Sequence, residues 1–206
     1  MGSSAGGYPI PARPVRVTEV IQRSRFLTVL AHAPDAEAAH HFVQSLRDEH
    51  PDATHHCWAF VAGPPGSTAA VGMSDDGEPH GTAGRPMLTT LLHSGVGEIA
   101  AVSVRWYGGT KLGTGGLSRA YSGGVKAALA ELEVESKIER ARVEIVVGYA
   151  HVDALQRLLD AMDGVQVEER YGGEVRYVVD LPEIRFAAFE RALADLTQGA
   201  GRLRRV

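Results

Sequence analysis

The chain of 206 residues contains one cysteine, Cys57. A single cysteine excludes an intramolecular disulfide and a zinc site built from several cysteines, and it favours a reducing compartment. No apolar run approaches the roughly 18 residues of a membrane span, and the N-terminus lacks the pattern of a signal peptide. We therefore expect a cytoplasmic protein with no membrane partner.

A surplus of positive charge is also missing. The 21 lysines and arginines are outnumbered by 25 aspartates and glutamates, which gives a net charge of −4. This balance excludes a nucleic-acid binder that is basic over its whole surface, although a local basic patch is compatible with it. The hydrophobic fraction of 44% is ordinary for a folded protein and argues against wholesale disorder.

Local patterns predict a mixed α+β fold in two domains. Residues 1–14 are expected to form a flexible leader, residues 15–135 the first domain and residues 140–206 the second. The charged segment 133–139 has no core pattern and marks the boundary. In the first domain we predict, in chain order, strands over 15–21 and 24–33, a helix capped by Asp35 that ends before Pro51, strands over 55–62 and 67–73, a helix over 85–93, a strand over 97–107 and a helix over 117–132.

The second domain has the order βαββαβ, which is that of the ferredoxin-like fold. Gly172 and Gly173 form a strong hairpin signal between its second and third strands. The predicted elements are a strand over 142–149, a helix over 152–162, strands over 165–171 and 174–181, a helix over 182–196 and a strand over 201–206.

Residues 105–124 are rich in glycine, and glycine is kept at such density only where the backbone turns sharply or approaches something closely. The segment meets neither the phosphate-loop motif, which needs lysine where Thr114 stands, nor the dinucleotide fingerprint. Glycine amides at a helix start can nevertheless hold an anion. A tight turn for helix–sheet packing is the alternative. The candidate anion or nucleic-acid contacts are Arg85, Arg105, Tyr107, Gly108, Gly109, Lys111, Gly113, Thr114, Gly115, Gly116 and Arg119.

The acidic loop over residues 74–84 supplies further candidates. Its side chains are of the types that hold a hard divalent metal, but their spacing is not that of an EF-hand loop, and Asp75 and Asp76 are adjacent, which weakens a carboxylate dyad. We favour a loop that balances charge, and we expect no metal and no cofactor. The residues expected to line a cleft are His56, Asp75, Asp76, Glu78, His80 and Thr82. On a strand His56 faces away from His55 and Cys57, and we expect Cys57 to be a core residue.

Three separated motifs, at residues 52–60, 74–86 and 105–121, together resemble the YigZ/IMPACT family over residues 24–132. The resemblance implies a two-layer first domain with a left-handed crossover, as in a small-subunit ribosomal protein and elongation factor G. It also implies a ferredoxin-like second domain similar to one of that elongation factor. Eukaryotic relatives regulate translation through an activator of an initiation-factor kinase, but they carry an accessory domain that this chain lacks. For bacterial members the implied role is association with nucleic acid or the ribosome, without an established reaction.

Two hypotheses about function remain open at this point. The leading one is a non-enzymatic protein that binds RNA, the ribosome or a translation factor through the cations of the glycine-rich segment. The rival is an enzyme or sensor for a phosphorylated small molecule or nucleotide, with residues 113–116 holding the anion and Asp76 or Glu78 acting as base or metal ligand. The second domain, in which no polar cluster is apparent, suits a protein-docking or dimerising module. The oligomeric state is left open.

Overall fold

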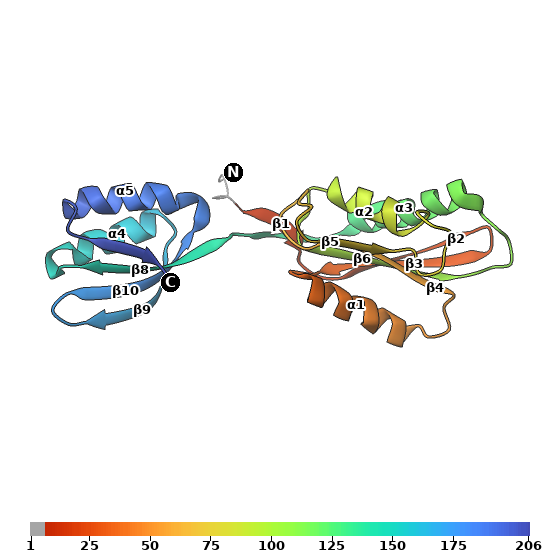
Figure 1. Cartoon of the computed structure of the whole chain (residues 1–206), viewed down its shortest axis with the longest axis horizontal. Coiled ribbons are helices and arrows are strands. Elements are labelled where there is room, and N and C mark those ends of the chain that lie inside the picture. The colour runs from red at the N-terminus through yellow and green to blue at the C-terminus, as the bar shows by residue number, and fades with distance from the viewer. Residues whose placement is uncertain (1–6) are drawn as a thin grey trace. The chain divides into compact units, whose positions relative to one another are not determined.

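The computed structural model describes residues 7–206, which fall into two compact units, Tyr8–Lys137 and Ile138–Val206 (Figure 1). Each unit has its own hydrophobic core. The predicted mixed α+β fold in two domains is therefore confirmed.

Strand β1, Tyr8–Pro11, lies in the segment expected to be a flexible leader, so that expectation is wrong for these residues. β1 pairs antiparallel with β7, Val134–Lys137, in the segment expected to have no core pattern. The pairing joins two segments far apart in the sequence, and neither has a local pattern that indicates it. Residues 1–6 of the expected leader lie outside the described residues.

The larger unit is built on a five-stranded antiparallel sheet. Its strands, in spatial order, are β2 (Val15–Ile21), β3 (Ser24–His32), β6 (Ile99–Trp106), β4 (His55–Val61) and β5 (Val71–Ser74). Every residue of the central strand β6 except Trp106 is buried, because the sheet is covered on both faces. β3 and β4 flank β6 and run parallel to each other, joined through a helix.

Helix α1, Ala36–Glu49, packs on one face of this sheet, while α2, Gly84–Leu92, and α3, Gly113–Glu131, cover the other (Figure 1). Val43 of α1 packs with Val102 and Val104, whereas Tyr121 of α3 belongs to a separate cluster on the opposite face. The unit thus has one layer more than the two layers that we expected. The extra layer is α1, which covers the face of β6 that carries Ala100, Val102 and Val104.

In the larger unit, β5 and α3 begin furthest from the predicted residues. β5 starts at Val71 and not at residue 67, because the chain is still in the connection that follows the proline-containing turn. α3 starts at Gly113 and not at residue 117, so the glycines expected in a loop form the first turn of the helix. Glycine is a poor helix former, and the propensity signal is overridden here by the packing of the helix on the sheet.

The smaller unit has the strand order of a ferredoxin-like sheet, β11-β8-β10-β9, with all neighbours antiparallel. Side chains of its two helices meet those of the sheet in one core. Its elements are β8 (Arg140–Val147), a 3₁₀ turn (Tyr149–His151), α4 (Val152–Ala161), β9 (Val165–Tyr171), β10 (Val175–Pro182), a second 3₁₀ turn (Glu183–Arg185), α5 (Phe186–Thr197) and β11 (Arg202–Arg205).

The sheet of the smaller unit carries ion pairs that the sequence did not lead us to expect. Arg176 and Arg204 both donate to Glu144, at 2.8 and 2.7 Å, and Arg142 forms a two-point contact with Asp180. The expectation that this half has no polar cluster is therefore wrong. The partners lie on different strands, so their proximity follows from sheet register and is invisible along the chain.

None of the helices in the described part of the chain combines the length and the apolar character needed to cross a bilayer.

Candidate functional site

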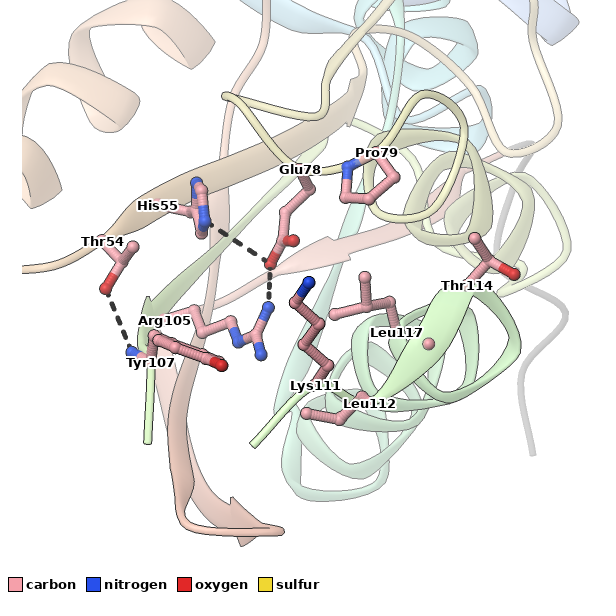
Figure 2. Close-up of a pocket in the computed structure, with 11 residues that line it drawn as sticks. Thr54, His55, Glu78, Pro79, Arg105, Tyr107, Lys111, Leu112, Thr114 and Leu117 are labelled. Atoms are coloured by element: carbon pink, nitrogen blue, oxygen red, sulfur yellow. Dashed lines mark hydrogen bonds and ion pairs between the residues drawn. The ribbon is translucent and has the colours of Figure 1, made fainter. Parts of the chain in front are cut away.

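A cavity of about 440 Å³ opens in the larger unit where β4, β6, the loop after β5 and the start of α3 meet. Its size lies within the range of small-molecule sites, roughly 300 to 1,000 Å³. Figure 2 shows how its side chains face one another. The cavity is lined by Thr54, His55, Glu78, Pro79, Arg105, Tyr107, Lys111, Leu112, Gly113, Thr114 and Leu117.

The floor of the cavity is a buried ion pair between Glu78 and Arg105. Nη1 of Arg105 donates to Oε1 of Glu78 at 2.6 Å, and the two side chains are only 5% and 4% exposed. The hydroxyl of Tyr121 donates to the same oxygen at 2.7 Å, and Nη2 of Arg105 donates to Ser24 at 3.2 Å. Burial and the neighbouring carboxylate raise the pKa of Tyr121, so its hydroxyl remains a donor. The floor therefore has no net charge.

His55 stands beside this pair. Its Nδ1 donates to the backbone oxygen of Asp76 at 2.8 Å, which fixes the ring and its tautomer. Its Nε2 is 4.0 Å from Oε1 of Glu78, on the cavity side (Figure 2). In the neutral ring this nitrogen is an acceptor for a ligand.

Lys111 and Tyr107 form the polar and aromatic part of the mouth, and both are exposed. Tyr107 is 46% exposed, and the Arg105 guanidinium lies 5.5 Å from the centre of its ring. Leu112, Leu117 and Pro79 supply an apolar wall. The mouth can thus receive a flat group against an aromatic ring and an anionic group beside an ammonium.

The start of α3 forms the remaining edge of the cavity. Gly113 and Thr114 line it, and no side chain caps this end of the helix. The first amides of a helix have no partner within the helix, and the helix dipole favours negative charge there. An anion at this edge would meet both these amides and Lys111.

At some positions of this segment the backbone geometry alone requires glycine, without any ligand. A Cβ on Gly108 would lie 2.0 Å from the backbone oxygen of Arg23, so the two backbones can meet only without a side chain. Gly109 and Gly113 have φ angles of 83° and 71°, a region that favours glycine. The turn interpretation therefore accounts for Gly108, Gly109 and Gly113, and the anion interpretation stays a prediction.

The structure brings only part of the predicted anion set together. Arg105, Tyr107, Lys111, Gly113 and Thr114 line the cavity. Gly116 and Arg119 line a separate cavity of about 240 Å³ beside β2, because α3 turns them to another side. The predicted residues that line neither cavity are Arg85, Gly108, Gly109 and Gly115.

Asp75 and Asp76 of the acidic loop do not line the cavity but hold the loop in place. Oδ1 of Asp75 accepts from the amides of Ala83 and Gly84 at 2.9 and 2.8 Å and so caps α2. Although burial by itself raises it, these bonds and that from Gly81 keep the pKa of Asp75 below its ordinary value. Asp76 accepts from Arg47 and from the amide of His56, at 2.8 and 2.6 Å.

The other predicted cleft residues also lie elsewhere. His80 is fully exposed, and the buried Thr82 donates to the backbone oxygen of Pro79 at 2.6 Å. His56 is buried on the α1 side of the sheet, where burial lowers its pKa. Since alternate residues of a strand face opposite sides, His55 takes the place in the cavity that we assigned to His56.

Cys57 and five residues that line the cavity remain to be placed. Cys57 is buried in the core as expected, its thiol donates to the backbone oxygen of Asp75 at 2.9 Å, and burial raises its pKa. Leu112 and Leu117 were missed, although their apolar character next to the glycines was a visible signal. Thr54, His55 and Pro79 were missed as well.

Among the described residues no three histidine, cysteine or carboxylate side chains are grouped to hold a metal ion.

Comparison with known families and proteins gives consistent matches along the chain. Residues 22–129 match the Impact N-terminal domain, and residues 145–200 match a domain of unknown function (DUF1949). The chain is 49% identical over 191 residues to the IMPACT family member YigZ of Escherichia coli (strain K12). The aligned region covers 93% of this chain and 94% of that protein.

A more distant relative and a solved structure match the chain in the same way. The IMPACT family member YvyE of Bacillus subtilis (strain 168) is 33% identical over 183 residues, with 87% of this chain and 82% of that protein covered. A crystal structure described as that of an hypothetical protein shares 47% sequence identity, with a TM-score of 0.72 and 98% of both chains covered.

Proposed function

The chain belongs to the IMPACT family, and we propose that it is a cytoplasmic, non-enzymatic protein that takes a nucleotide of single-stranded RNA into the cavity. The RNA is bound alone, as part of the ribosome or in a complex with a translation factor. One observation carries this proposal. Lys111, Tyr107 and the uncapped start of α3 border one cavity whose floor is electrically neutral.

The phosphate side of the proposal rests on charge. The floor pair of Glu78 and Arg105 cancels, so Lys111 is the cation left at the mouth, next to helix amides that favour an anion. One phosphate group would satisfy both. The net charge of −4 over the chain limits such binding to this locality.

The base side of the proposal rests on Tyr107. Proteins that bind single strands stack bases on exposed aromatic rings, and every base offers a flat face for this contact. Tyr107 is exposed, and the nearby Arg105 guanidinium helps to hold its ring. Leu112 and Leu117 offer apolar contacts opposite.

The proposal assigns no catalytic role to the acidic loop and the thiol, because these groups have structural partners or are buried. Glu78 accepts from Arg105 and Tyr121, Asp75 caps α2, and Asp76 binds Arg47. The raised pKa of the buried Cys57 thiol keeps it from acting as a nucleophile.

A second candidate function is binding of a free nucleotide or another phosphorylated small molecule. The size of the cavity favours it, since about 440 Å³ suits a ligand of that class. A free ligand at 100 times its Kd stabilises a protein by about 2.7 kcal/mol. Thermal unfolding with nucleoside monophosphates therefore tests this candidate directly.

The test of RNA binding is fluorescence anisotropy with a short, labelled single-stranded RNA at several salt concentrations. If phosphates are contacted, the logarithm of the association constant falls linearly with the logarithm of salt, by about 0.7 for each phosphate. Lys111→Glu is expected to weaken binding and to reduce the slope by about 0.7, the value for one phosphate contact.

Lys126→Glu is the matched control, because Lys126 is an exposed lysine of α3 that lies outside the cavity. Its charge change is identical, so it reports the effect of net charge alone. Binding that does not depend on salt, or an equal loss in both variants, contradicts the proposed function. Stabilisation by a free nucleotide without any affinity for RNA would favour the second candidate.

A further inference from the structure

The floor of the cavity presents two hydrogen-bond acceptors that have no donor among the described residues. One is Oε2 of Glu78, since Arg105 and Tyr121 both donate to Oε1. The other is Nε2 of His55, since the ring donates through Nδ1 to the backbone of Asp76. The Glu78 side chain is only 4% exposed, yet neither of these two atoms is among the fully buried side-chain atoms that lack a partner, so both can be reached by a ligand or water in the cavity.

The two acceptors belong to side chains that lie next to each other. Nε2 of His55 lies 4.0 Å from Oε1 of Glu78, the other oxygen of the same carboxylate, and Figure 2 shows both side chains at the same end of the cavity. Both are held firmly, His55 by the acidic loop and Glu78 by Arg105. The pair is therefore suited to a single ligand group that carries two N–H donors along one edge.

The charges around the floor decide which kind of donor group fits. The negative charge of Glu78 is already compensated by Arg105, and Lys111 and the start of α3 add positive potential at the mouth. A guanidinium or ammonium ligand would meet this potential unfavourably. The donors are better supplied by an uncharged group that belongs to an anionic ligand.

Among the RNA bases, guanine has this donor pattern. Its Watson–Crick edge carries the N1–H and the 2-amino group side by side, whereas adenine, cytosine and uracil each place an acceptor next to their donor. Unpaired bases of single-stranded RNA are recognised along this edge while they stack on aromatic side chains. The exposed ring of Tyr107 borders the same cavity.

We infer that the cavity selects guanine, with Glu78 Oε2 accepting from N1–H and His55 Nε2 accepting from the 2-amino group. The inference rests on the proposed function, because it names the base that the RNA-binding cavity takes. In this arrangement the base stacks on Tyr107, and its phosphate lies toward Lys111 and the start of α3.

The experiment uses the full chain and three short RNAs of uridine that differ in one central base, which is guanine, hypoxanthine or adenine. Hypoxanthine differs from guanine only by the missing 2-amino group, so the comparison leaves the protein unchanged. The guanine RNA is expected to bind at least about fivefold more tightly than the other two, the lower bound for a two-point base contact. The His55→Phe variant keeps an aromatic ring but lacks the acceptor, and its preference for guanine over hypoxanthine is expected to vanish.

The outcomes separate the inference from the proposed function. Equal binding of all three RNAs overturns the inference while RNA binding stands. Absence of binding to any of them overturns both. Displacement of the RNA by N-acetylarginine amide, but not by guanosine monophosphate, would assign the two acceptors to a guanidinium and overturn the inference. If His55→Phe does not fold, the base series alone decides.

Discussion

The Arg105 guanidinium and the Glu78 carboxylate form a buried ion pair, 2.6 Å apart, that joins the central strand β6 to the acidic loop. A buried charge without its partner is expensive, whereas a complete pair with further hydrogen bonds is tolerated. Ser24 and Tyr121 supply two of those further bonds. The pair thus fixes the loop against the sheet and sets the position of the cavity floor.

Removal of one member of this pair is expected to destabilise the protein strongly. Glu78→Ala leaves Arg105 as an uncompensated buried cation and should cost about 3–5 kcal/mol of unfolding free energy. Glu78→Leu combined with Arg105→Met removes both charges and should recover a large part of that loss. Urea unfolding of the single and double variants checks this. A double variant less stable than Glu78→Ala would contradict it.

Replacement of the exposed aromatic ring at the mouth tests the stacking contact. Tyr107→Ala is expected to weaken binding of single-stranded RNA by about 1–3 kcal/mol, the usual range for a lost base–aromatic contact. Tyr107→Phe keeps the ring and should bind almost as the parent does. Tyr149→Ala, which removes an exposed tyrosine of the smaller unit, serves as the control. Equal affinity of Tyr107→Ala and the parent in anisotropy titrations would remove Tyr107 from the site.

The elements that could be predicted from the sequence are those in which apolar residues recur at the spacing of a helix or a strand. α1 shows this well, because Asp35 caps it and Ala39, Val43 and Leu46 recur on its buried face. β1 could not be predicted, since it depends on pairing with β7 at the other end of the unit. Such a pairing is a property of the folded chain and leaves no local signal.

The candidate site was predicted in part for a similar reason. The alternation along β4 shows that His55 and His56 face opposite sides, but it cannot tell which side holds the cavity. That depends on α3 covering one face and α1 the other. Arg119 was misplaced because its position around α3 depends on where the helix begins, and the glycines concealed that start.

Gly108 is expected to be intolerant of any side chain. A methyl group there would lie 2.0 Å from the backbone oxygen of Arg23, so Gly108→Ala must displace the connection between β2 and β3. We expect a loss of at least about 1–3 kcal/mol, as for other overpacked sites. Gly123→Ala is the matched control in α3, where a Cβ meets nothing within 4 Å, and it should stabilise by about 0.5–1 kcal/mol. Equal stability of the two variants in urea unfolding would show that the approach of Gly108 to Arg23 is not constrained.

Glu98 gives the clearest prediction of pH dependence. Its side chain is 4% exposed and accepts from Tyr8 at 2.9 Å, from His32 at 2.7 Å and from Lys137, so it ties β1 and β7 to the sheet. Burial by itself raises the pKa of Glu98, but the bonds from Lys137, His32 and Tyr8 hold it below its ordinary value of 4.5.

A carboxyl group whose pKa is lower in the folded than in the unfolded chain stabilises the fold above its unfolded pKa and loses that effect as the pH falls through its folded pKa. Glu98→Gln should therefore cost about 1–3 kcal/mol near pH 7, the value of hydrogen bonds to a charged group, and progressively less below the ordinary value of 4.5. Urea unfolding of both proteins between about pH 7 and pH 3 measures the difference. Glu131→Gln, at the exposed end of α3, is the control and should leave the pH profile unchanged. A difference between parent and Glu98→Gln that stays constant over this range would show that the charge of Glu98 does not hold β1 and β7 in place.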